Sequence, residues 1–139
     1  QETILDHSKR PRNHHPMQDA NRHAEGYNPL CGDKLKLYLK VENDVVRDVS
    51  FEGSGCAIST ASASMMTESL KGKTREEALK LLEKFHELLT TDTPVSQDLG
   101  KLVVFCGVRD YPVRVKCATL AWHTLKSALN GTGEVTSTE

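Results

Sequence analysis

The pattern that decides the fold runs over residues 34–41, where the chain reads KLKLYLKV. Leucine or valine occupies every second position, and lysine or tyrosine occupies the positions between them. A repeat of two residues predicts a strand with one buried face and one face in water. The polar triplet Glu42-Asn43-Asp44 is typical of a turn, and residues 45–52 predict a second strand. The two strands therefore form a predicted hairpin.

Two helices are predicted after this hairpin. Gly53-Ser54-Gly55 ends the second strand, and the small side chains of residues 59–71 predict a closely packed helix closed by Gly72. Thr74 and Glu77 have the spacing of a capping box, and apolar residues then recur at helical intervals. A second helix is therefore predicted from residue 74 to about residue 89.

The ends of the chain are less regular. A short helix is predicted over residues 4–10, followed by an irregular polar segment up to residue 29. Residues 99–106 fit a short helix, although the valines there also suit a strand. Pro112 lies near the first position of a last helix, closed by Gly131. Its predicted inner face contains Val113, Cys117, Leu120, Ala121, Thr124 and Ala128.

The order of these elements predicts the fold class. Strands precede most of the helices, which favours an α+β fold with a small antiparallel β-sheet followed by helices packed on one face. The length of 139 residues predicts a single domain over residues 1–139. Its ordered core is expected over about residues 4–130, and residues 132–139 are expected to form a loose tail.

Composition narrows the functional classes. The net charge is −1, with 27% charged and 37% hydrophobic residues, so nothing predicts binding to nucleic acid. No apolar run approaches the roughly 20 residues that span a bilayer, so no membrane partner is expected. Without a signal-peptide pattern, a cytoplasmic protein is expected. The four cysteines then favour metal or thiol chemistry over disulfides.

Cys31-Gly32-Asp33 combines two potential metal ligands just before a strand. Residues two apart in an extended segment point the same way, and the glycine between them permits a tight bend. A thiolate and a carboxylate in this arrangement can bind one ion together.

Cys56 and Cys117 have two interpretations each. Cys56 lies between a strand and a helix, where the helix N-terminus favours a thiolate, but a buried unreactive thiol fits equally. Cys117 follows the cations Arg114 and Lys116, which favour a thiolate. It also matches the apolar stripe of its helix, and by pattern alone core packing is favoured.

The other candidate residues predict structural roles. Cys106 follows an apolar run and is interpreted as a core residue. Solvent exposure is expected for His14, His15 and His23, which lie in the polar segment. His7, His86 and His123 lie on predicted helices without a partner at ligand spacing.

Together the motifs resemble one family, the IscU/NifU-type iron–sulfur cluster assembly proteins. Residues 4–7 (ILDH) and 11–13 (PRN) resemble its N-terminal signature. The segments Cys31-Gly32-Asp33, residues 53–59 (GSGCAIS) and Lys116-Cys117 resemble its three cysteine motifs in order. The resemblance covers about residues 4–130 and implies the IscU/SufU-like fold.

Two departures from the scaffold-type pattern make the chain similar to the SufU branch. Scaffold-type members carry a histidine directly before the third cysteine, where this chain has Lys116. The interval between Cys56 and Cys117 is also longer here than in those members. The resemblance implies that Zn²⁺ is bound by Cys31, Asp33, Cys56 and Cys117, with Arg114 and Lys116 as offsetting cations.

The resemblance also implies a function in iron–sulfur cluster assembly. In the SufU branch a zinc-binding protein accepts persulfide sulfur from a SufS-type cysteine desulfurase, and Cys31 is the predicted acceptor because a loop position moves more easily than a helix position. We hypothesise that a desulfurase residue replaces Cys31 at the zinc and frees its thiolate. Asp33, the hardest ligand, is expected to be released most easily. Downstream iron–sulfur assembly proteins or apo-proteins are the implied recipients.

Two alternatives stay open at this point. The same ligands suit a scaffold that assembles a transient [2Fe–2S] cluster, or binds iron, and passes the cluster to apo-proteins. An interaction module with a purely structural zinc also fits. A hydrolase with a catalytic cysteine is disfavoured because no histidine is placed as its base.

Overall fold

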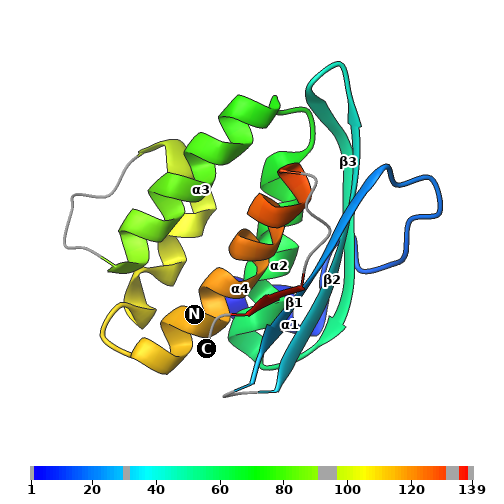
Figure 1. Cartoon of the computed structure of the whole chain (residues 1–139). Coiled ribbons are helices and arrows are strands. Elements are labelled where there is room, and N and C mark those ends of the chain that lie inside the picture. Colours follow the sequence, from blue (N-terminus) through cyan, green and yellow to red (C-terminus); the bar gives the residue numbers. More distant parts are fainter. Residues whose placement is uncertain (1, 30–31, 91–96, 131–134, 138–139) are drawn as a thin grey trace.

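The computed structural model describes residues 2–29, 32–90, 97–130 and 135–137. Within these ranges the strands form one sheet in the order β3-β2-β1-β4, as Figure 1 shows. The strands are β1 (Arg22–Asn28), β2 (Asp33–Glu42), β3 (Val45–Ser54) and β4 (Val135–Ser137). β2 pairs antiparallel with both β1 and β3, and β4 lies parallel to β1.

The predicted hairpin is confirmed as β2 and β3. Leu35, Leu37 and Leu39 of β2 are buried, as the alternating pattern predicts. Asn43 and Asp44 form the turn with φ values of 52° and 65°. Two successive positive φ values give the tight turn whose twist matches that of paired strands. This turn fixes the register of the inward-facing leucines.

β1 lies within the segment that the sequence predicted to be irregular. Its inward residues are Ala24, Gly26 and Asn28, which are buried although none has a large apolar side chain. The helix α4 (Pro112–Leu129) passes so close that a Cβ atom on Gly26 would collide with Oγ1 of Thr124. Close packing, rather than an alternation of large apolar residues, therefore defines this strand.

The predicted loose tail is wrong for residues 135–137. Val135 pairs with Glu25 in the parallel ladder between β4 and β1. Three residues are too few to show a strand by their hydrophobic periodicity. Asn130 caps α4, and the predicted cap at Gly131 lies outside the described residues.

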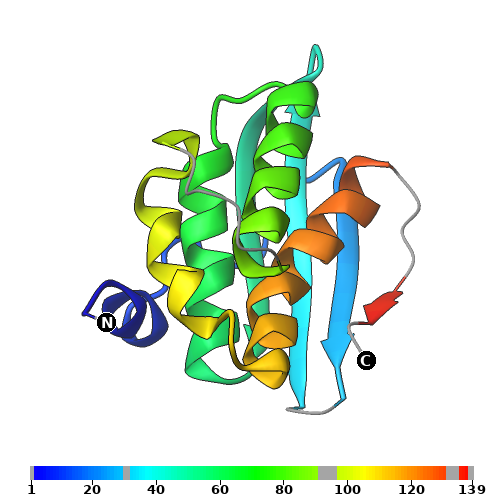
Figure 2. The ribbon, with the colours of Figure 1, turned by 90° about the vertical axis from the view of Figure 1, so that its left-hand side faces the viewer.

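The helices cover one face of the sheet (Figures 1 and 2), which confirms the predicted α+β class. α2 (Ala57–Leu70) packs on β3, and α4 packs on β1 and β2. An outer layer contains α3 (Arg75–Thr90), which packs on α4, and the 3₁₀ helix η1 (Gln97–Val108), which packs on α3. None of the described helices is long and apolar enough to cross a membrane.

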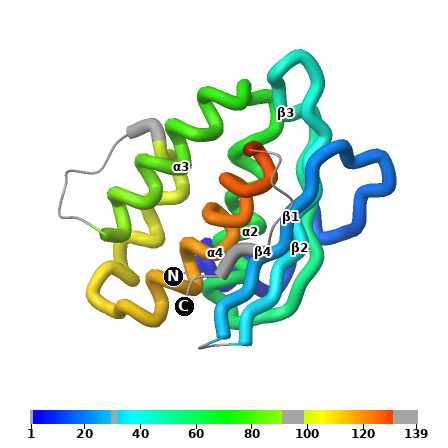
Figure 3. Tube along the Cα trace, viewed as in Figure 1, coloured from blue at the N-terminus to red at the C-terminus, as the bar shows by residue number. Residues whose placement is uncertain are grey.

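Two local features confirm further predictions. The capping box begins α3: Thr74 N donates to Glu77 Oε1 at 3.0 Å, and Glu77 N donates to Thr74 Oγ1 at 3.1 Å. The short N-terminal helix is α1 (Glu2–Lys9), which packs on α2. Figure 3 shows the chain running from α1 past the β3 edge, where Phe51 N donates to Asn13 O at 2.9 Å.

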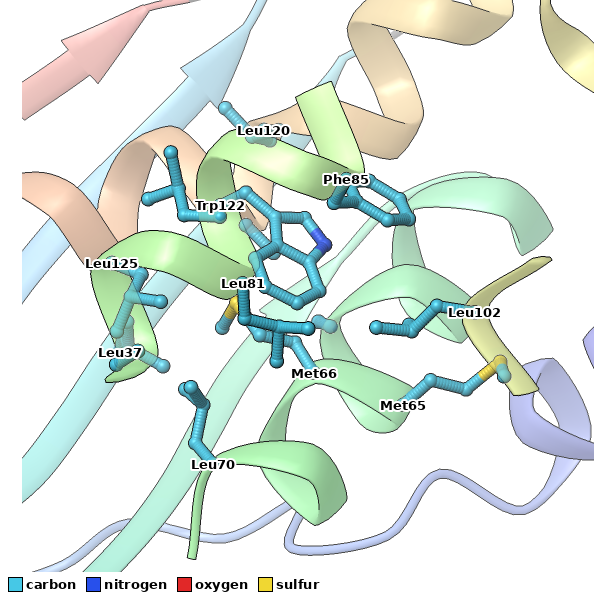
Figure 4. Close-up of a cluster of buried hydrophobic side chains, with 14 of the residues drawn as sticks. Leu37, Met65, Met66, Leu70, Leu81, Phe85, Leu102, Leu120, Trp122 and Leu125 are labelled. Atoms are coloured by element: carbon cyan, nitrogen blue, oxygen red, sulfur yellow. The ribbon is translucent and has the colours of Figure 1, made fainter. Parts of the chain in front are cut away.

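An aromatic cluster joins the two helical layers (Figure 4). Trp122 of α4 stacks on Phe85 of α3 with ring centroids 4.6 Å apart, and Phe105 of η1 meets Phe85 edge-on at 5.6 Å. The indole N–H of Trp122 donates to Ser62 Oγ of α2 at 3.1 Å. The cluster therefore holds α4, and with it Cys117, in a fixed position against α2.

η1 corrects the interpretation of Cys106. The chain of η1 is kinked at Gly100, whose φ of 54° and ψ of −127° are not helical. After the kink every third residue is buried, as 3₁₀ geometry requires: Leu102, Phe105 and Val108. Cys106 follows Phe105 and is exposed, so it is not a core residue.

Candidate metal centre

Three of the four predicted ligands meet at one end of the sheet. Asp33 begins β2, Cys56 directly precedes α2, and Cys117 lies in the second turn of α4. One potential ligand atom from each side chain lies within 4.8 Å of the others. Among the described residues, no other set of three or more His, Cys, Asp or Glu side chains meets this criterion. Cys31 lies outside the described residues.

Asp33 is the most enclosed of the three ligands. Its side chain is fully buried, and Oδ1 accepts a hydrogen bond from the backbone N–H of Cys56 at 2.8 Å. Gly55 lies directly against the carboxylate, because a Cβ atom at this position would collide with Oδ1 of Asp33. Burial and this contact leave the carboxylate little room to move. The expectation that Asp33 is released most easily stays a prediction.

Cys56 is the N-cap residue of α2. Its backbone is extended, with φ −72° and ψ 167°, and its Sγ atom accepts from the N–H of Ser59 at 3.4 Å. The thiol thus occupies the place that a serine hydroxyl commonly takes at a helix start. Because Cys56 caps the helix, α2 begins two residues earlier than predicted, and its side chain stays half-buried.

Cys117 fits both interpretations that the sequence left open. It is buried with 2% exposure, as the apolar stripe predicts, and it also faces Asp33 and Cys56. Asn28, at the end of β1, contacts both Cys117 and Asp33: its Nδ2 lies 3.5 Å from Cys117 Sγ and 3.4 Å from Asp33 Oδ2. Sequence reasoning missed Asn28, although its period-two spacing from Ala24 and Gly26 was a usable signal.

The predicted cations lie on the first turns of α4. Arg114 is exposed, and its guanidinium lies over the ring of Tyr111, 5.0 Å from the centroid. Lys116 is half-buried. Val113 was predicted to face inward, but it is 51% exposed. The roles of Arg114 and Lys116 as offsetting cations stay predictions.

The donor set determines which ions suit this centre. Two thiols and one carboxylate lie together, and sulfur and oxygen ligands in tetrahedral geometry suit Zn²⁺. Iron bound through cysteine thiolates is compatible with the same groups. The residues present therefore fit a thiolate-rich metal site, to which Cys31 would add a fourth ligand.

The histidines lie apart from this centre. The buried His7 places Nδ1 2.7 Å from Ser64 Oγ and Nε2 3.5 Å from Glu68, so it joins α1 to α2. His86 and His123 contact each other edge-on between α3 and α4, with ring centroids 5.9 Å apart. Burial lowers the pKa of His123 below its ordinary value, and the neighbouring His86 contributes to this shift.

Comparison with known proteins agrees with the motifs. The family model described as the NifU-like N terminal domain matches residues 1–130. The chain is 44% identical over 127 residues to the iron–sulfur cluster assembly scaffold protein IscU of Streptococcus pyogenes serotype M1, covering 91% of this chain and 79% of the relative. It is 42% identical over 129 residues to the zinc-dependent sulfurtransferase SufU of Bacillus subtilis (strain 168), covering 92% and 87% respectively.

A solved structure supports the same relationship. The crystal structure of FiSufU from the thermophile Fervidobacterium islandicum AW-1 superposes with a TM-score of 0.86 at 40% identity, covering 93% of this chain and 95% of that protein. The resemblance inferred from the sequence motifs is therefore confirmed, and so is the fold that it implied.

Proposed function

This chain belongs to the NifU-like N-terminal domain family of iron–sulfur cluster assembly proteins, and on that premise we propose that it is a zinc-binding sulfur acceptor. It takes persulfide sulfur from a SufS-type cysteine desulfurase. The observation that carries this proposal is the convergence of Asp33, Cys56 and Cys117 within 4.8 Å, which brings two thiols and a carboxylate together from separate segments.

The proposed zinc ligands are Cys31, Asp33, Cys56 and Cys117. When bound, zinc stabilises the thiolate forms of the cysteines at neutral pH. The relative from Bacillus subtilis is named as a zinc-dependent sulfurtransferase, which supports this choice of metal. Arg114 and Lys116, close in sequence to Cys117, are proposed to offset the negative charge of the ligand set.

Cys31 is the proposed sulfur acceptor. Cys117 is buried, and the thiol of Cys56 accepts the N–H of Ser59 as a helix cap, so neither is well placed to meet a partner's persulfide. In the transfer, the Cys31 thiolate attacks the outer sulfur of the donor persulfide. The donor sulfur–sulfur bond breaks, the donor cysteine leaves as a thiolate, and Cys31 becomes a persulfide.

The surface beside α4 supports contact with a protein partner. Tyr111 and Val113 are 53% and 51% exposed, and they flank the helix start that leads to Cys117. Aromatic and apolar residues of this kind are enriched where proteins bind one another. We therefore propose that the desulfurase covers this surface while it delivers sulfur.

A cluster scaffold is the second candidate, favoured by the name of the Streptococcus pyogenes relative. It predicts that anaerobic reconstitution with iron and sulfide gives a stable [2Fe–2S] absorption spectrum and a cluster that transfers to an apo-protein. The sulfur-acceptor proposal predicts no transferable cluster, and zinc in the purified protein.

The experiment that tests the proposal combines metal analysis with a desulfurase activation assay. The zinc-loaded wild-type protein should increase turnover of a SufS-type desulfurase, and Cys31→Ser should abolish the increase. Cys106→Ser is the matched control, because Cys106 is exposed on η1 and should leave the activation unchanged. Activation by Cys31→Ser at the wild-type level would refute the assignment of the acceptor.

A further inference from the structure

Asn28 lies where β1 reaches the candidate metal centre. It is the last residue of the β1 ladder and pairs across the sheet with Asp33. Its side chain points to the helix-covered face and is fully buried, between the carboxylate of Asp33 on β2 and the thiol of Cys117 on α4. Asn28 thus connects two candidate ligands that come from opposite layers of the fold.

The chemistry of the amide suits these neighbours. A primary amide nitrogen carries two N–H donors, whereas a carboxylate and a thiolate only accept hydrogen bonds. One Nδ2 atom lies 3.4 Å from Asp33 Oδ2 and 3.5 Å from Cys117 Sγ, so it can serve both acceptors. A buried amide without partners would cost free energy. The amide dipole also presents its positive end to two groups that must be anionic to bind metal.

The two bonds give Asp33 and Cys117 a support that does not depend on other ligands. Asp33 has its second support from the N–H of Cys56 at 2.8 Å, and Cys117 has its own from the packing of α4. Donors to metal ligands fix ligand orientation and tune metal affinity. No charge is added by Asn28, so the ligands keep their full negative charge for the metal.

We infer that Asn28 is a positioning residue that holds Asp33 and Cys117 together as the fixed half of the metal centre. This inference rests on the proposed function, because it assumes that the centre binds metal. Asn28 acts through the two ligands: it sets their separation and orientation and makes Cys117 a weaker electron donor to the metal. Zinc affinity and the thiolate–metal bond should therefore both depend on its amide.

Two variants of similar size test this role. Asn28→Leu removes the donors, and Asn28→Asp replaces the amide by a carboxylate that repels both ligands. Zinc affinity is measured by competition with a chromophoric chelator, and the thiolate-to-metal charge-transfer band is measured with Co²⁺ in place of zinc. We expect Asn28→Leu to weaken zinc binding about 10- to 100-fold, the range found for partners of metal ligands, and Asn28→Asp to weaken it further. The Co²⁺ band should shift in both variants.

Thr67→Val is the matched control. Thr67 is also fully buried, and its hydroxyl donates to Ser64 O at 2.7 Å on α2 and accepts from Asn13 Nδ2 at 3.0 Å. Its loss should lower the unfolding temperature and leave zinc affinity and the Co²⁺ band unchanged. Asn28→Asp differs from the wild-type residue by one atom, so it keeps the test decisive if Asn28→Leu does not fold.

The outcomes separate this inference from the proposed function. Wild-type zinc affinity and an unshifted Co²⁺ band in both Asn28 variants would overturn the positioning role alone. Weakened binding in those variants, in a protein that accepts no sulfur, would support the positioning role and overturn the sulfur-acceptor function. A wild-type protein that binds neither zinc nor Co²⁺ would overturn both.

Discussion

Asp33 and Cys117 lie on the buried side of the candidate metal centre, whereas Cys56 lies at its half-exposed rim. The buried pair is bridged by the Asn28 amide, and the carboxylate also accepts from the backbone of Cys56. The thiol of Cys56 donates to Asp33 Oδ2 at 3.9 Å and also has a local partner, the N–H of Ser59 three residues along the chain. The rim residue thus has the support of a helix start in addition to its tertiary contacts with Asp33.

This difference indicates that binding the metal and reacting with a partner protein need different residues. Groups fixed by buried hydrogen bonds keep a metal site in shape, but a large donor protein cannot reach them. Reaction with a persulfide needs a thiolate that can approach the partner, and neither Asp33 nor Cys117 meets this condition. We therefore propose that the buried pair binds the metal and that Cys31 accepts the sulfur.

Removal of zinc should have the largest effect, because the metal joins the two sides of the centre. At free zinc a thousandfold above the dissociation constant, binding stabilises the folded state by about 4 kcal/mol. Chelation should lower the melting temperature correspondingly, as calorimetry measures. Cys106→Ser should show the same drop as the wild-type protein. An unchanged melting temperature after complete chelation would mean that the centre does not bind metal in the folded protein.

Gly55→Ala perturbs the buried side directly. The new Cβ would collide with Oδ1 of Asp33, and such overpacking costs about 1–3 kcal/mol of unfolding free energy. It should also weaken zinc binding, since the carboxylate must move.

Gly72→Ala controls for the effect of adding a methyl group to a glycine. Gly72 has a φ of +85° with open space around it, so the variant should cost about 1 kcal/mol and leave zinc affinity unchanged. Urea unfolding and chelator competition measure both effects. Equal zinc affinity in the two variants would show that Asp33 is not held by Gly55.

A pair of serine variants compares the buried side with the rim in the zinc-free protein. Cys117→Ser puts a hydroxyl in place of a buried thiol and should cost about 1–3 kcal/mol. Cys56→Ser keeps a helix cap of the favoured type and should change stability by less than about 0.5 kcal/mol. Urea denaturation measures both. Equal losses would contradict the division of the centre into two differently held sides.

Acidification should act far from the centre and have the smallest effect. The pKa of His123 is lowered first by burial and then by His86 and Lys126, so the unfolded chain takes up a proton at higher pH than the folded protein does. The folded protein therefore loses stability as the pH falls below about 6.5. The free energy of unfolding decreases by at most about 1.4 kcal/mol per pH unit.

His123→Gln should reduce this dependence, and His15→Gln, at an exposed position, should not. Unfolding curves of zinc-free protein at several pH values measure the slope. A slope in His123→Gln as steep as in the wild-type protein would rule out His123 as its source.

The parts of the fold with a strong local signal were predictable from the sequence. Alternating leucines and the Asn43-Asp44 turn predicted the hairpin, and the Thr74–Glu77 box predicted the start of α3. β1 was missed because its inward residues are small, and their burial depends on α4, which follows almost a hundred residues later.

Three of the four predicted ligands lie together in the structure, whereas the residue that supports them was not predicted. The position of Cys117 was compatible with a core residue and with a metal ligand, because a buried ligand lies on the same helical stripe as a core residue. Cys106 was misassigned since the apolar period there is three residues, as in a 3₁₀ helix, which a search at 3.6 does not distinguish. Asn28 meets Asp33 across the β1–β2 ladder and meets Cys117 only where α4 packs on the sheet, so its period-two spacing predicts an inward side chain but not these contacts.

The most direct test of the account locates the transferred sulfur. The zinc-loaded protein is mixed with a SufS-type desulfurase and cysteine, persulfides are trapped by alkylation, and the cysteine-containing peptides are identified by mass spectrometry. We expect one added sulfur on Cys31 and none on the buried Cys117 or on Cys106. Sulfur on Cys117, or on no cysteine of this chain, would contradict this expectation.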